Sequence, residues 1–133
     1  IYGKPVSRFV AEFMGEVNLF ALASNTKGAL SSDVLKISPS TKLDAVPPDS
    51  RGLLMVRPEY MRFAGGANSH DFTLTGTFHG EYALGSRIQY ELKTPQGIVT
   101  VEKLREDRLR AREGDTVAVG FNADITHFIG DAT

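Results

Sequence analysis

Cysteine is absent from the sequence of 133 residues. Its absence excludes disulfide bonds, thiolate metal sites and cysteine nucleophiles together, and it fits a reducing compartment. A long apolar run is absent too. A helix that crosses a membrane needs about 18 or more apolar residues in a row, and the sequence has no such stretch. Residues 1–8 do not have the basic-then-apolar form of a secretory signal.

An excess of positive charge is also lacking. The formal net charge is -1, and the sequence pI is about 6.3. A protein that follows a phosphate backbone usually carries a basic stripe, which supplies most of its affinity. We therefore expect no nucleic-acid partner.

The familiar patterns of nucleotide and hydrolase sites do not occur. There is no GxxxxGK[ST] loop, no GxGxxG opening a helix and no GxSxG. His70, His79 and His127 fall in separate predicted elements, which disfavours a metal site. Glu106 and Asp107 lie in a charged loop, whereas an acid and base pair needs burial. We expect no catalytic, cofactor or metal site, so the fragment itself is predicted not to be an enzyme.

Short strands are what the sequence does contain. Residues 71–78 alternate cleanly, with Phe72, Leu74, Gly76 and Phe78 on one face, which predicts a half-buried strand. The turn 94–97 joins two alternating segments into a hairpin. Other strands are expected over 17–23, 34–37, 53–56, 87–93, 98–104, 117–121 and 125–129. About eight strands against one helix indicate an all-β fold.

The helix is expected over residues 5–14. Phe9, Val10, Phe13 and Met14 recur there at helical spacing. A helix this short is not stable alone. Its apolar stripe must therefore dock either on the following core or on a domain outside this fragment.

The central apolar stretch, residues 53–56, predicts a strand covered on both faces. Arg57 precedes Pro58, and the proline ends the strand because it cannot donate to the ladder. Glu59 is within side-chain reach of Arg57, and Arg62 adds a second guanidinium nearby. One interpretation is a local salt bridge at the strand end. The other is that Arg57 and Glu59 face a partner surface.

Two long polar segments are expected to be loops. Residues 38–51 contain three prolines and read as a solvated connection. Residues 105–115 carry both charge signs and are interpreted as a solvated loop, with a binding patch as the alternative. The strand aromatics are assigned to the core rather than to base stacking: Phe20, Phe72, Phe78, Tyr90 and Phe121.

Several motifs resemble those of one protein family. The pattern at the start resembles the segment where the ATPase domain of many bacterial ABC importers gives way to its C-terminal regulatory domain: Ile1-Tyr2, Pro5, Phe9-Val10-Ala11, Phe13, Gly15-Glu16 and Asn18. Val56-Arg57-Pro58-Glu59 resembles the arginine-proline-glutamate signature of that regulatory domain, often called the TOBE domain. Three further segments resemble the glycine-and-strand pattern of the TOBE barrel: Gly76-x-Phe78, Leu84-Gly85-Ser86 and Gly114-Asp115-x-Val117.

The resemblance implies an OB-like barrel fold with exchanged strands. It implies that residues 1–16 are a tail helix and linker from a preceding ATPase domain, and that residues 17–133 are the TOBE-type barrel. The chain begins at Ile1 without a methionine, so we expect a piece of a longer protein. The interface or regulatory residues that the resemblance suggests are Arg57, Glu59, Arg62, Glu16 and Asn18.

The resemblance also implies partners. The parent chain would be a transport ATPase that binds ATP and Mg²⁺ in its ATPase domain, with no cofactor in this fragment. It would form a homodimer under transmembrane permease subunits, at the cytoplasmic face of the bacterial plasma membrane. A small molecule or protein could act as regulator, and the solutes of the resembling subgroup are sugars, polyamines and related compounds. The alternative function is a stand-alone β-barrel module that binds a sugar or an oxyanion.

Overall fold

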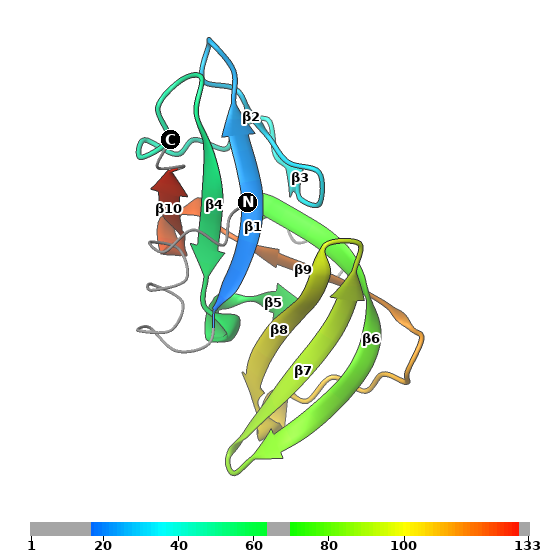
Figure 1. The fold of residues 1–133 in the computed structure, drawn as a ribbon. Coiled ribbons are helices and arrows are strands. Elements are labelled where there is room, and N and C mark those ends of the chain that lie inside the picture. The colour runs from blue at the N-terminus through cyan, green and yellow to red at the C-terminus, as the bar shows by residue number, and fades with distance from the viewer. Residues whose placement is uncertain (1–16, 64–69, 131–133) are drawn as a thin grey trace.

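Two antiparallel sheets make up the fold of the computed structural model, which describes residues 17–63 and 70–130 (Figure 1). The first sheet has the strand order β10-β4-β1-β2, and its strands are β1 (Asn18–Ser24), β2 (Leu30–Ser31), β4 (Arg51–Val56) and β10 (His127–Gly130). The second has the order β5-β9-β6-β7-β8, with β3 paired to β6; its strands are β3 (Lys36–Ile37), β5 (Arg62–Phe63), β6 (Phe72–Leu84), β7 (Arg87–Thr94), β8 (Gly97–Leu104) and β9 (Thr116–Phe121).

In the described residues, three short 3-10 helices connect these strands: η1 (Pro58–Tyr60), η2 (Arg105–Asp107) and η3 (Ala123–Ile125). The all-β prediction is confirmed for the described part of the chain. The helix expected over residues 5–14 lies outside the described residues.

The first sheet is assembled from both ends of the described chain. β4 pairs with β1 on one side and with β10 on the other, and Leu54 is opposite both Phe20 and Phe128. Gly52 lies where β10 comes closest, because a Cβ on Gly52 would overlap the carbonyl oxygen of Ile129 and approach the Phe128 ring to 2.9 Å. The final strand is thus fitted against a position that tolerates no side chain.

The second sheet is built around β6, which is the longest strand and curves along the sheet (Figure 1). It pairs with β9 over its first half and with β7 over its second, and the register shifts between Phe78 and Gly80. The predicted strand ended at Phe78, whereas β6 continues to Leu84. The reason is this bulge, which interrupts the alternation in the sequence without ending the strand. Gly85, at a φ of 68°, makes the turn into β7.

The buried apolar residues that the structure describes form a core between the two sheets. Phe121 of β9 stacks on Phe20 of β1, with ring centroids 5.6 Å apart, and on Phe72 of β6, at 5.2 Å. Phe78 and Tyr90 approach each other at 6.2 Å in an edge-on arrangement. All five aromatics assigned to the core are at most 5% exposed, which confirms that prediction.

Candidate functional site

The strand end at Arg57 has the predicted local geometry. Arg57 is extended, with φ and ψ of -75° and 145°, and Pro58 opens η1 directly after it. Backbone bonds from Tyr60 N to Arg57 O (3.0 Å) and from Met61 N to Pro58 O (3.2 Å) close the turn. Proline suits this position because the first turn of a helix needs no donor there. The predicted end of the central strand is confirmed.

Arg57 and Glu59 form the predicted ion pair. Arg57 Nε donates to Glu59 Oε2 at 3.1 Å, with the two side chains 42% and 35% exposed. An ion pair this exposed contributes at most about 1 kcal/mol. A guanidinium has five N–H donors, and this bond uses one of them. The pair therefore orients a guanidinium that is still partly exposed.

The other predicted site residues lie in different surroundings. Arg62, on β5, is exposed, and its charge acts on Lys103 of β8. Asn18 is 5% exposed, and its amide is bonded to the backbone of Thr100: Nδ2 donates to Thr100 O (2.7 Å), and Oδ1 accepts from Thr100 N (2.8 Å). Glu16 lies outside the described residues.

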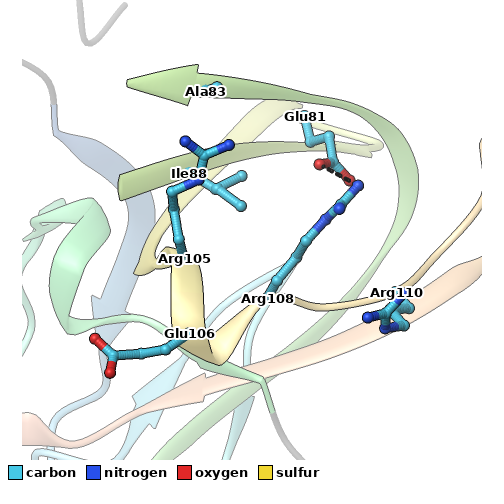
Figure 2. Close-up of a pocket in the computed structure, with 7 residues that line it drawn as sticks. All are labelled: Glu81, Ala83, Ile88, Arg105, Glu106, Arg108 and Arg110. Carbon is cyan, nitrogen blue, oxygen red and sulfur yellow. Dashed lines mark ion pairs between the residues drawn. The ribbon is translucent and has the colours of Figure 1, made fainter. Parts of the chain in front are cut away.

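Arginines gather at a second place, around a hollow of about 480 Å³ beside the β6–β7 hairpin (Figure 2). We call it the arginine hollow, and its lining residues are Glu81, Ala83, Ile88, Arg105, Glu106, Arg108 and Arg110. A neighbouring hollow of about 310 Å³ shares Glu81, Arg108 and Arg110. The charged loop therefore borders a concave surface.

Three contacts fix the loop against the hairpin. Arg105 N donates to Ser86 O at 3.0 Å, and Arg105 Nη1 donates to Gly85 O at 3.2 Å. Leu109 N donates to the Tyr90 hydroxyl at 2.8 Å. The arginines are thus presented from an anchored segment.

Charge in the arginine hollow is mixed. Arg108 Nη2 pairs with Glu81 Oε2 at 2.9 Å. Figure 2 marks this pair with a dashed line and shows Arg105 and Arg110 extending from the same segment toward other sides. Arginine forks match carboxylates and other oxyanions. The arrangement suits an anionic group better than a neutral one. Sequence patterns could not reveal the hollow, because it requires Glu81 and Arg108 to meet across two strands and a loop.

Within residues 17–63 and 70–130, no group of three or more His, Asp or Glu side chains is placed to hold a metal ion. The histidines stand in separate elements, with His70 ahead of β6, His79 inside it and His127 in β10. The described part of the chain also contains no helix long and apolar enough to span a membrane.

These features define a small all-β domain with curled sheets and charged surface sites. Residues 54–129 match the sequence model of the TOBE domain, and the chain belongs to that family. A curated relative is the spermidine/putrescine import ATP-binding protein PotA of Rubrobacter xylanophilus, which is 29% identical over 92% of this chain. The chain spans 34% of that relative's length.

A solved structure shares the fold. It is the cytoplasmic molybdate-binding protein ModG with molybdate bound, with a TM-score of 0.64 and 15% identity over 84% of this chain and 94% of that one. The likeness confirms the expected all-β, OB-like fold.

Proposed function

We propose that this chain is the non-catalytic C-terminal regulatory and dimerisation domain of the ATP-binding subunit of an ABC importer. The observation that carries the proposal is the alignment of 92% of the chain with an import ATP-binding protein that is about three times as long. The TOBE match begins at Leu54, two residues before the Val56-Arg57-Pro58-Glu59 motif.

Partners and location follow from the proposal. ATP and Mg²⁺ would bind the ATPase domain of the parent chain, and the fragment itself would hold no cofactor. The parent would work as a homodimer under two permease subunits at the cytoplasmic face of the membrane. The solute classes we propose are polyamines, to which the spermidine and putrescine in the relative's name belong, and sugars.

The dimer contact is proposed at the end of β4. Arg57 and Glu59 are partly exposed and held together, and Arg62 is exposed on β5 nearby in the chain. Glu16 belongs to the same proposed set. Asn18 would act indirectly, because its buried amide fixes the start of β1 next to Val56.

The parent gene and a charge reversal test this proposal. A phosphate loop of the form GxxxxGK[ST] should be encoded upstream of Ile1. In the complete subunit, Arg57→Glu should weaken self-association about tenfold, which corresponds to about 1.4 kcal/mol. Lys93→Glu, an exposed charge reversal on β7, is the matched control. An upstream region without a nucleotide-binding motif would refute the proposed ATPase parent. Equal self-association of both variants would refute the proposed dimer contact.

A second candidate is a small-ligand module that binds an oxyanion or a sugar. The arginine hollow and the likeness to a molybdate-binding fold support it. A ligand at 100 times its Kd should stabilise the chain by about 2.7 kcal/mol. We expect molybdate or sulfate to raise the Tm of the chain, and Arg108→Gln with Arg110→Gln to abolish the rise. The absence of any shift with anions and sugars would count against this candidate alone.

A further inference from the structure

The ion pair between Glu81 and Arg108 lies where two hollows meet. Arg108 Nη2 is 2.9 Å from Glu81 Oε2, and the two side chains are 51% exposed for Arg108 and 28% exposed for Glu81. Both residues line the arginine hollow, and both also line the neighbouring hollow of about 310 Å³. The pair therefore belongs to the wall that the two hollows share, where solvent reaches both partners.

The charge around this pair is positive, although the whole chain has a net charge of -1. Each hollow is lined by three arginines and two carboxylates. Arg108 and Arg110 line both hollows, Arg105 lines the arginine hollow, and Arg112 lines the neighbouring one. An anion that enters either hollow therefore meets more guanidinium groups than carboxylates.

The loop that carries Arg108 is held by contacts other than this pair. Tyr90 is opposite Glu81 in the ladder of β6 and β7, and its hydroxyl accepts a bond from Leu109 N at 2.8 Å. Arg105 N donates to Ser86 O at 3.0 Å. Glu81 can therefore leave Arg108 without releasing the loop, and an exposed ion pair of this kind is weak.

We propose that the Glu81 carboxylate occupies the place of an anionic ligand on Arg108, and that it restricts the site to doubly charged oxyanions. The inference rests on the oxyanion-binding candidate and names the ligands that this site selects. A singly charged carboxylate offers Arg108 only the contact that Glu81 already makes, and it loses its free motion on binding. A dianion carries a second charge for another arginine, such as Arg110, so it can displace Glu81.

The variant Glu81→Gln tests the inference, because it removes the competing charge and keeps the size of the side chain. At constant ionic strength, its Kd for sulfate should be about fivefold lower than that of the unchanged chain, which corresponds to about 1 kcal/mol. A residue that merely supported the hollow would give the opposite sign. Acetate should compete poorly with sulfate in the unchanged chain and better in Glu81→Gln.

Glu102→Gln is the matched control. Glu102 Oε2 pairs with Arg87 Nη1 at 3.4 Å, with side chains 22% and 47% exposed, and neither residue lines the two hollows. The control removes the same charge from a pair of similar exposure in the same sheet. It should therefore leave the Kd for sulfate unchanged.

A dianion can be free in solution or part of a larger molecule. Glycerol phosphate at pH 8, where the ester carries two charges, is therefore measured beside sulfate. Tighter binding of either probe by Glu81→Gln supports the inference. A preference for glycerol phosphate would assign the site to a phosphate ester, and a preference for sulfate to a free oxyanion.

The remaining outcomes separate this inference from the candidate function. No binding of either probe by the unchanged chain or by Glu81→Gln would overturn both. Binding that Glu81→Gln leaves unchanged or weakens would overturn the inference alone, and so would equal tightening in Glu102→Gln. Far-UV circular dichroism checks that Glu81→Gln retains its strands. Glu81→Thr, a residue type that suits strands, replaces it if it does not.

Discussion

The amide of Asn18 pairs with both backbone groups of Thr100, at 2.7 and 2.8 Å. Asn18 begins β1 of the first sheet, and Thr100 lies in the middle of β8 of the second. One side chain therefore provides the hydrogen bonds that a neighbouring strand would otherwise give. The two sheets are joined at this point by an amide instead of by a shared strand.

Replacing Asn18 by Ala should be costly. Thr100 is 6% exposed, and the substitution leaves its backbone N–H and C=O without these partners. A buried unsatisfied group costs about 1–3 kcal/mol, so we expect a loss of about 2–4 kcal/mol in the free energy of unfolding by urea. Amide hydrogen exchange at Thr100 should become faster.

Asn122→Ala is the control for this prediction. Its Oδ1 accepts a bond from Asp71 N at 3.2 Å in an exposed place, so we expect a loss below about 1 kcal/mol. Equal losses for the two variants would mean that the link between the sheets adds nothing to stability.

Gly52→Ala should loosen β10. The added methyl would overlap Ile129 O and lie 2.9 Å from Phe128 Cζ, so the last strand must move. Overpacking of this kind costs about 1–3 kcal/mol. In Gly80→Ala the nearest atom is Tyr82 Oη at 3.5 Å, and the change should stay within about 1 kcal/mol. Urea unfolding of both variants, and hydrogen exchange in β10, would show whether this difference exists.

Tyr90 should make stability fall at high pH. Burial, opposed by the bond from Leu109 and assisted by the Glu81 carboxylate, raises the pKa of Tyr90 above its ordinary value of 10.0. As the pH rises, the unfolded chain loses the Tyr90 proton before the folded chain does. The contribution of the protonated Tyr90 to folding stability is therefore complete below pH 10.0 and is lost as pH rises through the folded pKa. Tyr90→Phe should be less stable at pH 8 by about 1 kcal/mol, from the lost Leu109 bond. The difference in the free energy of unfolding between the unchanged chain and Tyr90→Phe should narrow above pH 10. A difference that stays constant with pH would contradict the raised pKa of Tyr90.

Lys103 should affect the pH dependence of stability in the opposite direction from Tyr90. Burial, together with the charge of Arg62, lowers the pKa of Lys103 below its ordinary value of 10.5. The folded chain then holds this proton less tightly than the unfolded chain, so charging Lys103 costs stability below the folded pKa. Lys103→Met should raise the Tm at pH 7, and the advantage should shrink as the pH approaches 10.5. Lys93→Met, on an exposed position, should show neither effect; similar curves for both would refute the prediction.

Local patterns predicted the strands whose alternation is intact. Residues 17–23, 87–93 and 117–121 correspond to β1, β7 and β9 within one or two residues, and the hairpin turn at 94–97 is confirmed. The two-residue strands β2 and β5 were missed, because so short a piece has no periodicity. The segment 34–37 is a strand only at Lys36–Ile37.

The site was predictable only where it is local. Arg57 and Glu59 are two positions apart, and their ion pair follows from chain geometry at a proline. Asn18 and Thr100 are 82 positions apart, and no pattern in either segment indicates the other. The arginine hollow likewise depends on how the β6–β7 hairpin and the loop after β8 meet. Long-range packing, not local preference, decides these contacts.

The place of β10 beside β4 affects how the protein is made. Phe128 pairs with Leu54, so the first sheet has to wait until nearly all of the described chain has left the ribosome. Until then β4 presents an unpaired edge of mostly apolar residues, the kind of edge to which other strands add. A chain that stops before His127 should therefore be a substrate for chaperones and proteases, even though every residue of its second sheet is present.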